Sequence, residues 1–282
     1  MKSQVKTVVR VGRIQYTNTL PFFHKLETSS VLETHYYAAY PSRINLALRK
    51  GKIDIAPISS LEYLNHHEHY YLLPGIGIGA RDFSGSVILF SKEKIENLNH
   101  QTIALTRQSL SSSVLMRILL KFKYKYENKF KVFNSEPEKI LKTCPAALLI
   151  GDQALLYRNR DFVYKYDLSE LWWNWTEKPF CFSLWAVRKT FAEENPEAVC
   201  QFYRDLKNNL ARNLEDLETL IKEARQLSFL DADFSKIFGY LFNLCYGLDD
   251  SMREGLDLFY RMAHRLQFSP KPKALEFFQV ER

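Results

Sequence analysis

Small polar side chains gather in four short turns, each of which follows an apolar run and precedes a helical pattern. The turns are Tyr16-Thr17-Asn18-Thr19, Ser59-Ser60-Leu61-Glu62, Ser109-Leu110-Ser111-Ser112 and Gly151-Asp152-Gln153-Ala154. A helix start presents unpaired backbone N–H groups and the positive end of the helix dipole, so hydroxyl and amide side chains there can bind an anion. The turns therefore predict a site for a small acidic molecule, provided that at least two of them face one crevice at the carboxyl ends of strands.

Each turn can also be an ordinary helix cap, which is the role that cap statistics favour for any single turn. Asp152 shows the alternatives: it can be a general base, or it can cap a helix or orient a neighbouring donor, and we favour the structural role. Glu62 follows Ser59 by three residues, which is the spacing of a capping box, so we expect it to support that turn.

Strands alternate with helices through the first two-thirds of the chain, which is the pattern of an α/β protein. The expected strands are residues 8–16, 53–58, 86–91, 102–106 and 146–150, and helices are expected to begin near Thr19 (as N-cap), Pro41, Ser59 and Ser109. After about Arg188, leucines recur at helical spacing, so we expect the last third to be largely helical. We find no flexible Gly/Ser linker and therefore expect two lobes, joined by short crossings near residues 90–96 and 175–183.

The composition limits the class of protein. The chain has 282 residues with a net charge of +7, 46% hydrophobic and 25% charged, which is typical of a soluble globular protein. No apolar run reaches the ~20 residues of a membrane helix, and the N-terminus has no apolar export signal, so we expect a cytoplasmic protein without a membrane partner. Lys and Arg are spread along the chain without a recognised nucleic-acid module, so we expect no nucleic-acid partner. The cysteines Cys144, Cys181, Cys200 and Cys245 lie far apart and indicate neither disulfides nor a metal site.

Six motifs follow one another along the first two-thirds of the chain. They are VGRIQYTNTLPFF (11–23), GKIDIAPISSLEYL (51–64), SVILFS (86–91), SLSSSVLMRILL (109–120), LLIGDQALL (148–156) and DLSELWWNWTEKPFCFSLWAVR (167–188). In this order they resemble the motifs of the chorismate dehydratases of the futalosine route to menaquinone. Each motif is short, but six in the right order over about two-thirds of the chain are specific together. The helical tail fits the family's length without a motif of its own.

The resemblance implies a type II periplasmic-binding-protein-like α/β fold with a helical C-terminal region. Lobe 1 would comprise residues 1–92 and 183–282, lobe 2 residues 93–182, and the ligand cleft would lie between them. The implied reaction is the loss of water from chorismate to give 3-[(1-carboxyvinyl)oxy]benzoate, with no cofactor and no metal.

The resemblance and the turns together predict the site residues. Asn18 matches the family's Asn, and Ser86 stands at the head of its strand, so both are expected to act on the substrate, with Asp152 as the third catalytic candidate. The expected substrate-binding residues are Thr19, Ser59, Ser60, Ser109, Ser111, Ser112 and Gly151. If Asp152 is not the base, the enolpyruvyl carboxylate of the substrate is a reasonable proton acceptor, because it lies close to the proton that is lost.

The sequence departs from the family pattern at two places. Thr17 stands where the family usually has Leu, and Glu177-Lys178 stand where it usually has Gly-Leu, which puts the hinge geometry in question. Two other functions stay open: an enzyme like 1,4-dihydroxy-6-naphthoate synthase, which shares the fold, and a non-catalytic binding protein for a small carboxylate.

Overall fold

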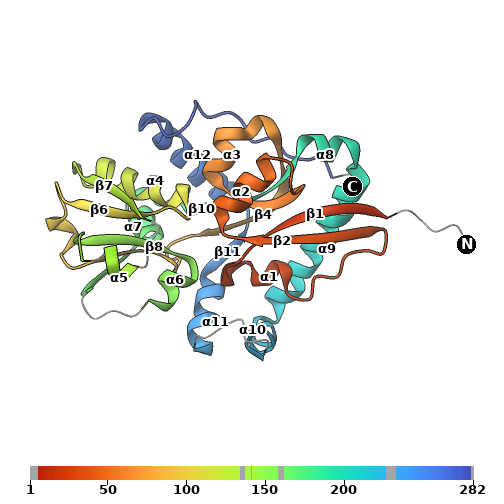
Figure 1. Cartoon of the computed structure of the whole chain (residues 1–282), viewed down its shortest axis with the longest axis horizontal. Helices are drawn as coiled ribbons and strands as arrows, with labels where there is room; N and C mark the ends of the chain where they lie inside the picture. The colour runs from red at the N-terminus through yellow and green to blue at the C-terminus, as the bar shows by residue number, and fades with distance from the viewer. Residues whose placement is uncertain (1–5, 134–136, 141, 158–161, 227–232, 281–282) are drawn as a thin grey trace, which may run out of the picture.

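The computed structural model describes residues 6–133, 137–140, 142–157, 162–226 and 233–280 (Figure 1). Residues 1–5, which are part of the segment judged to lack an export signal, lie outside the described residues. Two β-sheets lie side by side, each with helices packed around it (Figure 1).

The first sheet has six strands in the order β11-β4-β10-β3-β1-β2. Their bounds are β1 (Thr7–Ile14), β2 (Leu32–Ala39), β3 (Ile55–Ser59), β4 (Tyr70–Ala80), β10 (Phe180–Arg188) and β11 (Leu244–Gly247). β1 pairs in parallel with β2 and β3, whereas β10 runs antiparallel to both β3 and β4. The carboxyl ends of β1, β3 and β4 therefore meet at one edge of this sheet.

The second sheet has five strands in the order β7-β6-β8-β5-β9. Their bounds are β5 (Val87–Ser91), β6 (Thr102–Thr106), β7 (Lys129–Phe133), β8 (Ala146–Ile150) and β9 (Tyr164–Asp167). β6 pairs in parallel with β7 and β8, and β5 runs antiparallel to β8 and β9. Both sheets have the same plan. In each, the strand that arrives from the other sheet lies antiparallel between two strands that run in one direction: β10 lies between β3 and β4, and β5 lies between β8 and β9.

The chain crosses between the sheets at residues 81–86 and again at residues 177–179. The second crossing lies within the expected range 175–183. The first was expected at 90–96 and was wrong, because the apolar run Val87–Ser91 opens the second sheet instead of closing the first. We therefore propose lobe boundaries near residues 80 and 180, which moves β5 from lobe 1, where the boundary at 92 had placed it, into lobe 2.

Helices cover the sheets and form most of the last third. They are α1 (Leu20–Phe23), α2 (Pro41–Arg49), α3 (Ser60–His66), α4 (Leu110–Ile118), α5 (Pro137–Ile140), α6 (Gly151–Leu156), α7 (Leu168–Thr176), α8 (Lys189–Glu194), α9 (Pro196–Glu215), α10 (Leu217–Gln226), α11 (Phe234–Asn243) and α12 (Asp250–Arg265). Short helical turns precede or follow several of them, namely η1 (Thr17–Thr19), η2 (His67–His69), η3 (Ile95–Asn97) and the π-helical η4 (Leu119–Lys123). The helical expectation for the last third missed β11, a short strand that pairs with the end of β4. No helix in the described ranges is both long and apolar enough to cross a bilayer.

One helix joins the lobes away from the cleft. α12 packs against β10 of the first sheet and also against α4, which covers the second sheet. Tyr260 on α12 donates a hydrogen bond from its buried hydroxyl to the carbonyl of Ser60 at 2.7 Å. Trp172 is fully buried beside Phe180 at the second crossing, in an edge-to-face contact at 5.7 Å, so this tryptophan packs the junction between the lobes.

Candidate active site

The four polar turns converge between the two sheets. η1 follows β1, the Ser59 turn follows β3, the Ser109 turn follows β6, and Gly151 follows β8. Together they line a small inner cavity of about 60 Å³ at the carboxyl ends of these strands. The expected site residues among its lining are Asn18, Ser59, Ser86, Ser109, Ser112 and Gly151.

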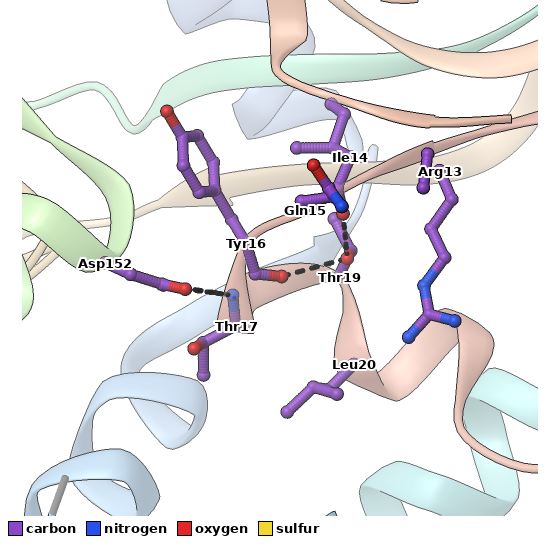
Figure 2. A pocket seen from close by; sticks show the side chains of 9 residues that line it. Arg13, Ile14, Gln15, Tyr16, Thr17, Thr19, Leu20 and Asp152 are labelled. Carbon is purple, nitrogen blue, oxygen red and sulfur yellow. Dashed lines mark hydrogen bonds between the residues drawn. The ribbon is translucent and has the colours of Figure 1, made fainter. Parts of the chain in front are cut away.

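A larger outer pocket of about 330 Å³ lies next to the inner cavity, with Ile14 and Tyr16 in the lining of both. Figure 2 shows it between the end of β1 and the start of α6. Of the expected site residues, Thr19 and Asp152 line this outer pocket and not the inner cavity. The candidate residues are thus divided between two neighbouring spaces.

Asn18, on the turn after β1, and Ser86, at the end of the first crossing, both line the inner cavity. The side-chain oxygen of Asn18 is buried and has no hydrogen-bond partner among the described residues. Ser86 is 4% exposed, its carbonyl accepts the N–H of Gly151 at 2.8 Å, and the phenol of Tyr240 lies beside its side chain. Burial raises the pKa of Tyr240, so the group beside Ser86 stays a neutral phenol.

The Ser109 turn caps α4 and also offers a donor to the cavity. Ser109 accepts a hydrogen bond from the N–H of Ser112 at 3.2 Å and donates its own proton to the Ser112 hydroxyl at 2.9 Å. The hydroxyl proton of Ser112 is therefore left to a ligand.

Ser59 is the expected N-cap of α3, and its hydroxyl accepts the N–H of Glu62 at 3.3 Å. The expected capping box was wrong, because the N–H of Ser59 donates to the side chain of Asn45 at 3.3 Å. The carboxylate of Glu62 instead accepts the hydroxyl of Tyr70 at 3.2 Å. Asn45 also donates to the Ser59 hydroxyl at 3.1 Å, so the proton of Ser59 is likewise left to a ligand.

Ser60 and Ser111 do not line the inner cavity. Their hydroxyl oxygens lie 3.2 Å apart across the lobe boundary, and Ser111 accepts the N–H of Leu61 at 3.0 Å. Both are almost fully buried. These two hydroxyls therefore join the lobes behind the cavity.

Thr19 stabilises its own turn. It occupies the N-cap position of α1, but its hydroxyl forms no cap bond and donates back to the carbonyls of Ile14 and Tyr16, both at 2.9 Å. The expected capping by Thr19 was wrong, because the backward bond closes the turn of η1.

Asp152 connects the lobes across the outer pocket. Its two carboxylate oxygens accept the backbone N–H of Thr17 at 3.0 and 3.2 Å (Figure 2). It does not cap its own helix, whose cap position is Ile150. Burial raises the pKa of Asp152, and the hydrogen bonds from Thr17 act against this shift. Asp152 thus caps the first turn of η1 from the opposite lobe.

Tyr16 is a site residue that the sequence did not reveal. Its hydroxyl donates to the side chain of Gln108 at 2.7 Å, and its ring lies so close to Gly151 that an added Cβ there would come within 2.9 Å of it. Gly151 also has a φ of +57°, a conformation that glycine adopts without strain. No pattern in the sequence singles out Tyr16, because the contact exists only when the lobes meet.

Asp167 positions the crossing that carries Ser86. Its carboxylate is 2% exposed and accepts the N–H groups of Gly85 at 2.7 Å and of Ser84 at 3.1 Å. It also caps α7 through the N–H of Ser169 at 2.8 Å. Burial raises the pKa of Asp167, and these bonds oppose the shift. The capping spacing between Asp167 and Glu170 is a sequence signal that could have identified it.

Comparison with known proteins identifies the family. The sequence model of a family described as Menaquinone biosynthesis matches residues 9–265. The chain belongs to the menaquinone biosynthesis family. This confirms the family expected from the six motifs.

A curated relative agrees with this family, and solved structures agree with the fold. The chain is 29% identical over 281 residues to the chorismate dehydratase of Thermus thermophilus, covering 92% of this chain and 96% of the relative. A crystal structure of protein AF1704 from Archaeoglobus fulgidus is similar with a TM-score of 0.73, at 19% identity over 95% of this chain and all of the other. A Candida albicans protein described as having the generic periplasmic binding protein fold gives a TM-score of 0.63, at 12% identity over 98% of both chains. The expected two-lobed periplasmic-binding-protein-like fold is confirmed for this member of the menaquinone biosynthesis family.

The described residues include no group of three or more His, Cys, Asp and Glu side chains placed to hold a metal ion. The polar groups that line the inner cavity are instead hydroxyls and an amide, which suit hydrogen bonds to carboxylate and hydroxyl oxygens.

Proposed function

We propose that this protein is a chorismate dehydratase, which converts chorismate to 3-[(1-carboxyvinyl)oxy]benzoate and water. The observation that carries the proposal is the match over nearly the full length of both chains to the chorismate dehydratase of Thermus thermophilus. The motif residues Asn18 and Ser86 support it, because they line one cavity at the carboxyl ends of the strands.

The reaction makes limited chemical demands. A proton leaves the ring carbon that carries the ether, the hydroxyl leaves the neighbouring carbon as water, and the ring becomes aromatic. Because aromatisation drives the reaction, holding the substrate in a reactive geometry can supply much of the rate. Hydrogen-bond donors of fixed position are suited to this task.

We assign the substrate contacts to neutral groups. Asn18 would accept a hydrogen bond from the ring hydroxyl through its unpaired oxygen or hold a carboxylate through its NH₂ group, and Ser86 would donate to a carboxylate. Ser59 and Ser112 each have a proton left for a ligand oxygen, and Ser109 orients Ser112. Gly151 would contribute through its missing side chain, which lets the ring of Tyr16 pack against it in the wall of the cavity.

The position of Asp152 bears on the identity of the base. Both of its oxygens accept the N–H of Thr17, and it lines the outer pocket. The described lining of the inner cavity contains no carboxylate and no histidine. We therefore propose that the enolpyruvyl carboxylate of the substrate takes the proton, and that Asp152 is a positioning residue that holds the lobes together.

The inner cavity also implies motion. A volume of about 60 Å³ is far below the roughly 300–1,000 Å³ of a typical small-molecule site. The substrate can therefore enter only if the lobes separate, and the arrangement seen here is a closed one.

Incubation of the purified protein with chorismate tests the proposal. We expect a product lighter by one water, with the absorbance of a substituted benzoate, and no change with heat-inactivated protein. Binding of chorismate without any conversion would contradict the proposal and favour a solute-binding role. The cytoplasmic location and the absence of a nucleic-acid partner stay predictions, which cell fractionation and a nucleic-acid binding assay would test.

A further inference from the structure

The outer pocket has the size and the charge that the inner cavity lacks. Its volume of about 330 Å³ lies within the range of roughly 300–1,000 Å³ for small-molecule sites. Arg13 is the only basic residue in its described lining, and the described lining of the inner cavity has none. A dianion in the outer pocket therefore meets a positive charge that the inner cavity does not offer.

Arg13 is free to bind an anion. It stands near the end of β1, half-buried, and its guanidinium carbon lies 5.4 Å from the centre of the Phe23 ring. No carboxylate among the described residues pairs with it. A guanidinium held against a ring keeps its N–H fork in place for a bidentate contact with a carboxylate.

Gln15 adds a second donor on the same side. Residues two apart on an extended chain point to one face, and Gln15 and Arg13 both line the pocket (Figure 2). The Gln15 side chain is exposed and has no hydrogen-bond partner within the described ranges. Its amide can therefore support a ligand oxygen beside the guanidinium.

The opposite wall carries the other charge. Asp152 lies across the pocket from Arg13, tied to the N–H of Thr17, and Leu20 forms an apolar surface between them (Figure 2). A dianion would be repelled from the Asp152 side and attracted to the Arg13 side. One of its two carboxylates would therefore lie at Arg13, and the other would lie away from Asp152.

The outer pocket and the inner cavity share part of their wall, since Ile14 and Tyr16 line both. Tyr16 lines both spaces and is held by Gln108 of the other lobe. When the lobes separate, this bond breaks and the wall between the spaces moves. A molecule bound at Arg13 would then have to pass Tyr16 to reach the inner cavity that Asn18 lines.

We propose that the outer pocket is a capture site for ring dicarboxylates, in which Arg13 and Gln15 hold one carboxylate of the incoming molecule before the lobes close over it. As a capture site for chorismate it rests on the proposed function. As an anion site it stands on the cavity, the unpaired guanidinium and the neighbouring amide.

The test compares Arg13→Gln with Arg43→Gln, using isophthalate as the probe. Arg43 is exposed on α2 and lines neither space, so its replacement removes the same charge from the same lobe. We expect calorimetry to show isophthalate binding weakened about tenfold or more in Arg13→Gln, the loss typical of a charged hydrogen bond, and little changed in Arg43→Gln. Circular dichroism and thermal unfolding confirm that each variant is folded.

Kinetics with chorismate give the second measurement. In Arg13→Gln we expect KM to rise by about the same tenfold factor while kcat changes far less, and the dependence of kcat/KM on salt to weaken. Equal isophthalate affinity in wild type and Arg13→Gln, or equal losses in the two arginine variants, would overturn the capture site. A loss in Asn18→Asp without one in Arg13→Gln would overturn it too, because the probe would then sit in the inner cavity. If the wild type does not dehydrate chorismate, the proposed function fails, and the isophthalate measurement still decides the anion site.

Discussion

The amide of Asn18 is the polar group of the inner cavity with an unmet hydrogen bond. Leaving a buried acceptor unpaired costs about 1–3 kcal/mol, and its oxygen has no partner among the described residues. A substrate hydroxyl would satisfy this atom, so the unpaired oxygen marks where a ligand group is expected.

Asn18→Asp should reduce turnover by at least about 100-fold, the loss typical of removing a fixed donor at a reacting centre. The change keeps the size of the side chain, removes its NH₂ donors and places a negative charge beside a dianion. Gln153→Glu adds the same charge on α6 without lining either space and serves as the control. Steady-state kinetics measure the effect, and near-normal turnover in Asn18→Asp would remove this residue from the site.

Asp152→Asn distinguishes a base from a lobe contact. Asparagine still accepts the N–H of Thr17 through its side-chain oxygen but cannot take up a proton at neutral pH. We expect kcat/KM to fall by much less than the roughly 10²–10⁴-fold that follows the loss of a general base. Both a lower kcat and a higher KM should contribute to this fall. A loss at the upper end of that range with unchanged substrate affinity would make Asp152 the catalytic base.

The end of α7 shows how a helix terminus can keep its geometry when its sequence changes. Glu177 has a φ of +55°, and its N–H donates to the carbonyl of Trp173 at 2.8 Å. The resembling family usually has glycine here, which adopts this conformation without strain. The structure therefore answers the question that the sequence raised about this hinge: the left-handed turn is retained with glutamate in it.

Glu177→Gly should stabilise the protein by up to about 1 kcal/mol. A residue with a Cβ in the left-handed conformation costs roughly 1–2 kcal/mol, which glycine avoids. Part of this gain is offset because glycine makes the unfolded chain more flexible. Glu177→Ala is the matched control, since it removes the carboxylate and keeps the strain. Denaturant unfolding of both variants gives the difference between their free energies of unfolding. A less stable glycine variant than the alanine variant would show that the turn is not strained.

Single strands were predictable where an apolar run ends in a turn. The strands Thr102–Thr106 and Ala146–Ile150 have the expected bounds, because each is buried along most of its length and stops at a polar turn. β11 could not be predicted, because its four residues become a strand only by pairing with β4, which is far away in the sequence. The first crossing was misplaced for the same reason, since pairing partners and not local pattern decide to which sheet β5 belongs.

The turns that form the candidate site were predictable from the sequence. Which of their side chains face the cavity was not. Ser111 and Ser112 are neighbours on α4, yet one bonds Leu61 across the lobe boundary and the other lines the inner cavity. Successive residues of a helix point about 100° apart, so which hydroxyl faces a ligand depends on how the helix is rotated against the other lobe. Only tertiary packing sets that rotation.

In the molecule as a whole, contacts of two turns join the lobes around the cavity, in addition to the packing of α3 and α12 on α4. Asp152 binds Thr17, and Tyr16 binds Gln108 and lies on Gly151. None of these contacts lies within one sheet, so each can break without unfolding a lobe. Tyr16 and Gly151 are themselves part of the lining of the inner cavity.

Gly151→Ala should oppose closure. An added Cβ would meet the ring of Tyr16 at 2.9 Å, whereas the open lobes would leave that space free. We expect affinity for the reaction product to fall roughly tenfold or more, the effect of an overpacked contact. Gly75→Ala is the control, because Gly75 has a similar φ of +70° and nothing within 4 Å of an added Cβ. Calorimetry measures the affinity of both variants for the product. Equal losses of affinity would mean that backbone strain, and not the contact with Tyr16, causes the effect.

The insertion of β10 between β3 and β4 has a consequence for synthesis of the chain on the ribosome. All five strands of the second sheet lie between residues 87 and 167, so that sheet is complete once this stretch has been translated. The first sheet has by then four strands, and β3 and β4 cannot be joined until residues 180–188 emerge. The lobe that is begun first is therefore finished last. During that interval the open edges of β3 and β4 are the part of the nascent polypeptide most exposed to pairing with other chains, and the part that a chaperone would most usefully cover.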